Sequence, residues 1–92
     1  LVTALQKNYP NPFNPETTIR YSLSNNGPVK IQIYNIKGQL IRNLVNENKK
    51  AGNYTVIWNG KDEQGKSVSS GIYFYRMQSS KYSATQKMML MK

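Results

Sequence analysis

The chain has 92 residues, and its 13 Lys and Arg residues outnumber four acids, which gives a net charge of +9. A chain of this length forms a single domain, residues 1–92, with one modest core. It contains neither His nor Cys, which excludes thiolate chemistry, disulfide bonds and the common zinc sites.

The first distinctive element is a stiff, extended arm over residues 7–16. Its central part, residues 9–15, holds three of the chain's four prolines. Each proline lacks an N–H and restricts the residue before it to extended conformations, so the arm cannot be a helix or a central strand. Its two aromatic residues, Tyr9 and Phe13, are predicted to be structural anchors that are buried at one end of the core.

Alternation of apolar and polar residues predicts β-strands along the rest of the chain. This period of two is typical of strands that pack one face on a core. Turn sequences rich in Asn and Gly separate the segments at intervals of about 8–12 residues, as in two-sheet sandwiches. The expected fold is all-β: an immunoglobulin-like β-sandwich of about seven mostly antiparallel strands. The predicted strands are residues 2–6, 18–23, 29–34, 40–45, 54–58, 73–77 and 87–90.

The inward face of each strand supplies the predicted core. Trp58 is the only tryptophan, and we expect it to be the central packing residue and a structural anchor rather than a ligand-stacking platform. Burial of each large apolar side chain contributes roughly 1.5–3 kcal/mol to stability. The residues predicted to face inward are Ile19, Tyr21, Val29, Ile31, Ile33, Tyr54, Val56, Trp58, Tyr73, Tyr75, Met88 and Leu90.

The side-chain inventory argues against an enzyme and against a bound cofactor or metal. Of the four acids, only Asp62 and Glu63 are neighbours, whereas a carboxylate-dependent hydrolase needs two acids on separate elements at a set distance. Serine nucleophiles need an activating base, and no imidazole is present. Residues 59–65 contain two carboxylates, but a calcium loop requires more acids at fixed positions. A polar turn with Gly65 in the left-handed conformation is expected there.

The positive charge is spread along the chain rather than gathered in a block. Only Lys49 and Lys50 are adjacent, and the other basic residues extend from Lys7 to Lys92. A nucleic-acid-binding module concentrates its charge and interleaves it with exposed aromatics, so no nucleic-acid partner is expected. We expect these charged residues mainly to keep the surface soluble. An acidic protein or anionic lipopolysaccharide is the alternative, as a partner attracted by the positive charge.

Two further features concern targeting. No apolar run approaches the ~20 residues that a transmembrane helix needs. The first residues lack the pattern expected of an N-terminal signal peptide. Because the chain begins at Leu1 rather than Met, we expect it to have been cut from a longer precursor or excised as a domain.

Five segments in series resemble a known family. The opening L-x-x-N-Y-P-N-P-F-N-P-x-T-T-I-x-Y-x-L is followed by residues 29–38, 51–60, 70–77 and 85–92, which carry the motifs V-K-I-Q-I-Y-N-I-K-G, A-G-N-Y-T-V-I-W-N-G, S-G-I-Y-F-Y-R-M and T-Q-K-M-M-L-M-K. In this order and at this spacing, the chain resembles the type A C-terminal sorting domains of the type IX (Por) secretion system.

This resemblance implies a non-catalytic domain that directs a secreted cargo through the periplasm to the outer cell surface or the medium. It implies the secretion machinery and a sortase-like peptidase as partners. In the family, that peptidase often removes the domain and attaches the cargo to anionic lipopolysaccharide. Recognition is expected on the last two strands, because an edge strand suits strand addition. The residues implied are Gly71, Tyr73, Tyr75, Arg76, Lys87, Met88, Leu90 and Lys92.

A structural role is the alternative. A β-sandwich with an extended proline-rich arm can join head to tail, which would make the chain the self-assembling subunit of an extracellular filament or adhesive. The residues leave both functions open, and the oligomeric state in dilute solution distinguishes them.

Overall fold

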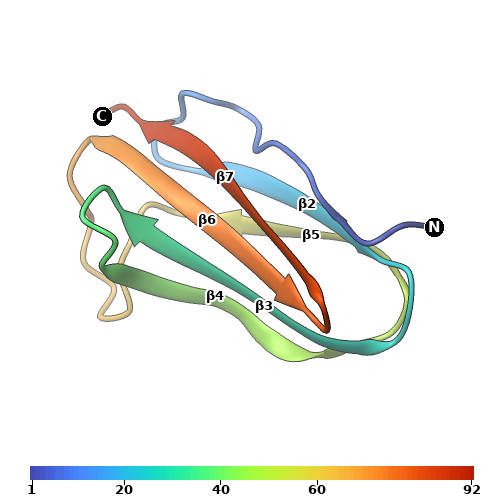
Figure 1. The fold of residues 1–92 in the computed structure, drawn as a ribbon. Helices are drawn as coiled ribbons and strands as arrows, with labels where there is room; N and C mark the ends of the chain where they lie inside the picture. Colours follow the sequence, from blue (N-terminus) through green and yellow to red (C-terminus); the bar gives the residue numbers. More distant parts are fainter.

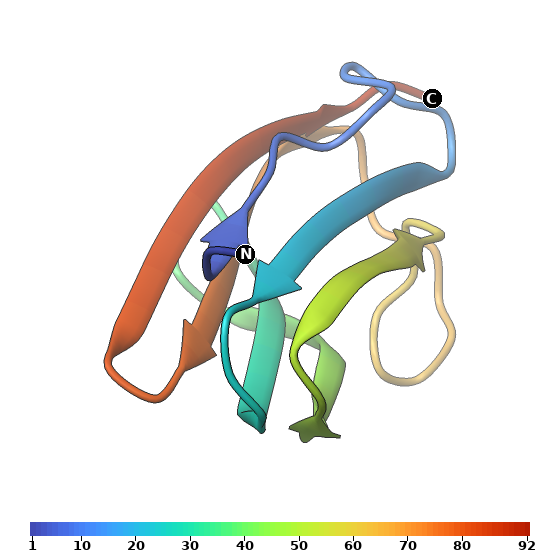
Figure 2. The same ribbon diagram turned by 90° about the vertical axis from the view of Figure 1, so that its right-hand side faces the viewer.

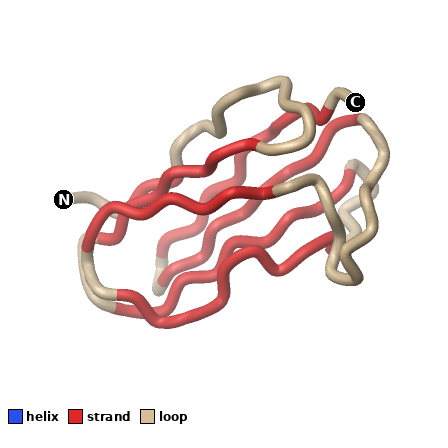
Figure 3. The backbone as a smooth tube through the Cα atoms, turned by 180° about the vertical axis from the view of Figure 1, so that it is seen from behind, coloured by secondary structure: helices blue, strands red, loops and turns tan.

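The computed structural model describes residues 1–92 as an immunoglobulin-like sandwich of two antiparallel sheets (Figures 1 and 3). One sheet has the strand order β1-β2-β5 and the other β4-β3-β6-β7, which confirms the predicted seven-stranded all-β fold. No helix that could cross a membrane is present. The strands are β1 (Ala4–Leu5), β2 (Thr17–Leu23), β3 (Gly27–Asn35), β4 (Leu40–Lys49), β5 (Gly52–Trp58), β6 (Gly71–Ser79) and β7 (Tyr82–Leu90).

β4 is longer than the segment 40–45 that the sequence predicts. It pairs with nearly all of β3, from Leu40 opposite Tyr34 to Lys49 opposite Gly27. Its second half is polar, so it shows no alternation from which a strand could be predicted. Two register shifts in this pairing leave extra residues on β4, and such bulges twist an edge strand and disturb further pairing.

The core is centred on Trp58, as predicted. Its side chain is fully buried, with ring centroids 5.7 Å from Phe13 and 5.4 Å from Tyr73. The indole N–H donates to the Lys61 carbonyl at 2.9 Å, so the ring's one polar atom keeps a partner. The other buried apolar residues are Leu5, Ile19, Tyr21, Leu23, Val29, Ile31, Ile33, Val45, Tyr75, Met77, Met88 and Leu90.

Two residues predicted to be in the core, Tyr54 and Val56, are only partly buried against it. Both lie on β5, the edge strand of the smaller sheet, where the opposite sheet covers the inner face less completely. Tyr54 is held there by stacking on Tyr21, with ring centroids 5.4 Å apart.

The arm connects β1 to β2. As predicted, it makes few backbone hydrogen bonds with the strands. Phe13 is 2% exposed and packs on Trp58, which confirms it as an anchor. The prediction for Tyr9 is wrong, because its side chain is 74% exposed. Tyr9 forms a two-bond bridge with Thr18 (N···O 3.0 and 2.9 Å), a β2 residue that is not part of the inward face.

The inward position beside Tyr9 is taken by a polar residue. Asn8 is 5% exposed, and its amide donates to the Thr17 hydroxyl at 3.0 Å and to the Pro10 carbonyl at 3.3 Å. Thr17 in turn donates to the same Pro10 carbonyl at 2.8 Å. The arm is therefore anchored by one aromatic ring and one buried hydrogen-bond network.

Candidate functional site

The terminal strand β7 has one face in the core and one edge away from the sheet. It pairs with β6 on one side only and is the outermost strand of its sheet. Met88 and Leu90 are at most 1% exposed, whereas Lys87 and Met89, which alternate with them, face outward. Figure 2 shows the arm passing beside the end of this strand.

The arm covers the last part of the β7 edge. The Met89 N–H donates to the Asn11 side-chain oxygen at 3.0 Å, and the Met89 carbonyl accepts from the Phe13 N–H at 3.0 Å. The Met91 N–H then donates to the Phe13 carbonyl at 2.9 Å. The arm thus occupies this end of the edge as a short parallel bridge.

The remainder of the edge is open. Backbone groups two residues apart on an antiparallel strand point to the same side, so those of Lys87, Thr85 and Ser83 point away from β6, as those of Met89 do. No strand pairs with them. We call residues 83–87 the open window.

Two β7 side chains, Tyr82 just before the window and Gln86 within it, tie β7 to the opposite sheet. The Leu5 N–H donates to the Tyr82 hydroxyl at 3.1 Å, and the Gln86 amide donates to the Leu5 carbonyl at 3.5 Å. These contacts leave the backbone groups of the window itself unpaired.

The other outer strand of this sheet is protected differently. The Asn43 N–H on β4 donates to the Glu63 carboxylate, and the Glu63 N–H donates to the Ile41 carbonyl at 3.2 Å. The loop that carries Glu63 is thereby held against β4. β4 is bulged and partly covered, which hinders the pairing of another strand with it. Of the two outer strands of this sheet, β7 therefore offers the regular edge that is available for pairing, at the open window.

That loop has the polar turn that the sequence predicts. The Asp62 side-chain oxygen accepts from the backbone N–H groups of Gln64 and Lys66, at 3.0 and 2.9 Å. Gly65 has a φ of 82°, in the left-handed region. The Asp62 carboxylate therefore closes its own turn.

The predicted recognition residues divide into two groups. The first group packs in the core, so its side chains are hidden and only its strand backbone is accessible to a partner. Among them, the Tyr75 hydroxyl donates to the Gln6 carbonyl at 2.7 Å, and burial raises the pKa of Tyr75 to about 12. This group comprises Tyr73, Tyr75, Met88 and Leu90, each 5% exposed or less.

The second group lies on the surface. Arg76 and Lys87 are exposed on the outer face of neighbouring strands. Lys92 follows β7, and its N–H donates to the Ser70 hydroxyl at 3.0 Å. Gly71 begins β6 opposite Leu90. The structure therefore gathers Arg76 and Lys87 near the open window and places Gly71 and Lys92 at the far end of β7.

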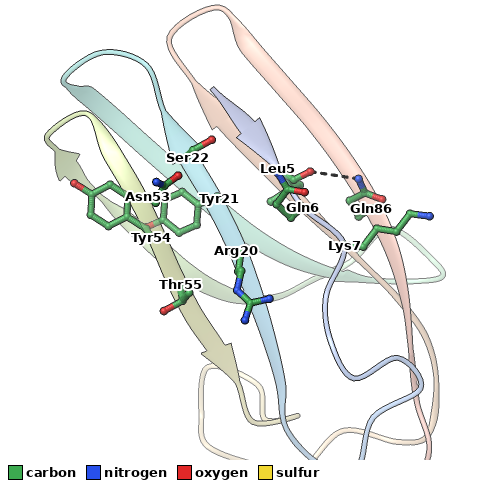
Figure 4. Close-up of a pocket in the computed structure, with 10 residues that line it drawn as sticks. All are labelled: Leu5, Gln6, Lys7, Arg20, Tyr21, Ser22, Asn53, Tyr54, Thr55 and Gln86. Carbon is green, nitrogen blue, oxygen red and sulfur yellow. Dashed lines mark hydrogen bonds between the residues drawn. The ribbon is translucent and has the colours of Figure 1, made fainter. Parts of the chain in front are cut away.

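A hollow of about 800 Å³ lies between β1, β2 and β5, with Gln86 at its margin (Figure 4). It contains the basic residues Lys7 and Arg20 but no acid. The Ser22 hydroxyl in it already donates to the Val2 carbonyl at 2.5 Å. The hollow brings together no nucleophile and base, so its geometry gives no support for catalysis.

Sequence reasoning missed the part that the arm plays at this site. Asn11 supplies a side-chain acceptor to a residue 78 positions away, and Phe13 supplies backbone groups to the same strand. No local sequence pattern predicts either contact, because the topology of the sandwich decides which strand the arm lies against.

Comparison with known proteins places this geometry in context. The family model of the FlgD Ig-like domain matches residues 14–83, which excludes most of the open window. No curated protein matches the chain.

Three solved structures share the fold. Dimeric latent PorU from Porphyromonas gingivalis has a TM-score of 0.72 and 18% identity over 97% of this chain. PorZ, described as an essential bacterial surface component of the type IX secretion system of P. gingivalis, has a TM-score of 0.65 and 26% identity over 94%. FlgD from P. aeruginosa has a TM-score of 0.63 and 24% identity over 80%. The chain spans only 10%, 11% and 57% of these three chains, respectively.

Proposed function

The chain belongs to the FlgD Ig-like domain family, and from this premise we propose that it is a non-catalytic targeting domain read by the type IX secretion machinery. A fold of this kind hosts many functions, so the proposal depends on a site rather than on the fold. The likeness to PorZ, a surface component of that system, supports the choice of pathway.

The observation that carries the proposal is the open window. Its unpaired N–H and C=O groups match the way in which one extended segment adds to the edge of a sheet. The arm limits that addition at Met89, and the β6–β7 turn limits it at Ser80. The site therefore accepts a short strand in one register.

The residues predicted for recognition take two roles in this proposal. The buried group, Tyr73, Tyr75, Met88 and Leu90, holds β6 and β7 in place so that the edge keeps its shape. The exposed group, Gly71, Arg76, Lys87 and Lys92, offers the side chains and backbone that a receptor touches.

In this proposal the cargo passes through the periplasm and reaches the outer surface or the medium. A sortase-like peptidase that removes the domain, and anionic lipopolysaccharide as the new anchor, belong to the same proposal. The net charge of +9 supports attraction to an anionic surface.

A proline at Thr85 tests the window. The backbone N–H of Thr85 points away from β6. Thr85→Pro therefore removes a hydrogen-bond donor for an added strand without breaking the hydrogen bonds between β6 and β7. In a bacterium with type IX secretion and a reporter fused ahead of Leu1, we expect the reporter to remain in the periplasm. Thr85→Val keeps the N–H and should secrete normally.

Thermal melting of each purified variant separates recognition from folding. A folded Thr85→Pro variant that is secreted like the wild type would contradict strand addition at this edge. If Thr85→Pro melts at a much lower temperature, Ser83→Pro at the start of the window repeats the test.

A further inference from the structure

The outer face of the β4-β3-β6-β7 sheet, turned toward the viewer in Figure 1, carries an apolar row across β4, β3 and β6 that ends at Lys87 on β7. Strand register places Lys87 beside Phe74, Phe74 beside Tyr34, and Tyr34 beside Leu40. Phe74 and Tyr34 are half-buried, and Leu40 is 47% exposed. Core packing does not explain this row, because the core lies on the opposite side of the sheet.

A second apolar pair, Ile72 and Met89, lies next to the row. Met89 is 39% exposed. Ile72 borders two shallow hollows, one of about 250 Å³ that also includes Pro12, and one of about 350 Å³ that also includes Ile36. The face as a whole is a flat sheet surface, which fits a macromolecule better than an enclosed small ligand, and the hollows suit individual anchor side chains.

The charge on this face has one sign. Its outward residues include Lys30, Arg76 and Lys87, whose register partners are uncharged. None of the four acids joins them: Glu47 pairs with the inward-facing Val29, Glu63 is held at the β4 edge, and Glu16 and Asp62 lie in loops.

We infer that this outer face docks an acidic protein partner that inserts apolar side chains beside Ile72 and Phe74. Interface cores are enriched in aromatic residues, Met and Arg, and this face combines all three. Complementary charge favours an acidic partner and disfavours a second copy of this chain, which would bring a second net charge of +9. This inference shares Arg76 and Lys87 with the proposed secretion site, but it does not depend on strand addition at the edge, because the partner docks on the face of the sheet.

A synthetic peptide of alternating Asp and Leu residues serves as the probe, titrated into the isotope-labelled domain and followed by NMR. We expect saturable shifts centred on Ile72, Phe74 and Lys87. Matched peptides with Lys in place of Asp, or Ser in place of Leu, should bind at least about tenfold more weakly.

Phe74→Ser should weaken binding of the Asp–Leu peptide by about tenfold or more, since buried aromatic anchors dominate such interfaces. Ile57→Ser is the matched control, because Ile57 is 57% exposed and lies on the other sheet. Melting curves establish that both variants are folded.

Three outcomes would overturn the inference: no saturable binding of the Asp–Leu peptide, equal binding of the Lys–Leu peptide, or undiminished binding by folded Phe74→Ser. Loss of binding in Thr85→Pro but not in Phe74→Ser would assign the peptide to the open window instead. Binding of anionic phosphatidylglycerol vesicles through these residues, without peptide binding, would replace the protein partner with a lipid surface.

Discussion

At the scale of single residues, one hydroxyl joins the two sheets across the middle of the molecule. Tyr75 is fully buried, and its hydroxyl donates to the carbonyl of Gln6, which follows β1. The neutral hydroxyl is thereby hydrogen-bonded although its ring is buried. The same burial makes ionisation of this ring unfavourable in the folded state.

This burial predicts a loss of stability at high pH. The pKa of Tyr75 is raised from 10.0 to about 12 in the folded chain. Below the unfolded pKa both states keep the proton and the contribution to stability is complete. As the pH rises from there toward the folded pKa, only the unfolded chain loses its proton, so the free energy of unfolding falls by up to about 2–3 kcal/mol.

Urea unfolding of the wild type and of Tyr75→Phe, followed by Trp58 fluorescence, measures this effect. Near neutral pH the variant should be about 1 kcal/mol less stable, because it lacks the hydrogen bond to Gln6. That difference should shrink as the pH approaches about 11. A difference that stays constant with pH would assign the alkaline loss to other groups.

The sequence did not predict which of the neighbouring side chains Asn8 and Tyr9 is buried. Aromatic character favours burial of Tyr9, and polarity favours exposure of Asn8, yet the structure has the reverse. The Tyr9–Thr18 bridge fixes which side chain points inward, and the Asn8 NH2 group donates to Thr17 and Pro10, while its buried side-chain oxygen has no partner. That register depends on three-dimensional pairing, which composition does not encode.

At the scale of elements, the arm acts through its two aromatic residues in opposite ways. Phe13 fills the core against Trp58, whereas Tyr9 stands in solvent. Phe13→Ala should therefore cost on the order of 3–5 kcal/mol, as for other buried aromatic residues. Tyr9→Ala should change stability by only about 0.5 kcal/mol, as for exposed sites.

The free energies of unfolding in urea, measured for both variants side by side, check this contrast. Each variant serves as the other's control, since both lose one ring from the same segment. Similar losses in the two variants would mean that the arm is not anchored as the structure indicates.

The strands were predictable where one face is buried and the other is exposed to solvent. Alternation marked β2, β3, β5, β6 and the last part of β7 because each packs a single face on the core. The strand predicted over residues 87–90 begins at Tyr82, so the sequence missed the first part of β7. Alternation failed over the second half of β4, where Asn46, Glu47 and Asn48 pair with β3 without contributing to the core. Alternation could not predict the contact between Asn11 and Met89, because no local sequence pattern relates residues that are so distant in the chain.

At the scale of the whole molecule, the edges of the larger sheet are partly covered. Glu63 and two bulges protect β4, and the arm protects the end of β7, which leaves the open window uncovered. An uncovered edge invites pairing between copies, but a charge of +9 on each copy opposes their approach. We therefore expect the domain to be a monomer in dilute solution, against the self-assembling subunit that the sequence left open.

Glu63→Ala should weaken that protection by freeing the Asn43 N–H on β4. Sedimentation velocity should show one species for the wild type, and concentration-dependent association for Glu63→Ala at moderate salt. Glu16→Ala is the control, since it changes the charge equally but removes an exposed acid away from this edge. Filaments formed by the wild type would restore the structural role.

The place of β7 in the sandwich has a consequence for biosynthesis. A ribosome delivers Met88 and Leu90 after all other core residues, and the arm has nothing to pair with at this edge until they emerge. Closure of such non-local pairings must wait for the last strand. Any polypeptide synthesised ahead of Leu1 would already be finished by then. A chain that stops short of β7 would lack the folded edge, so the edge forms only after everything ahead of β7 has been synthesised.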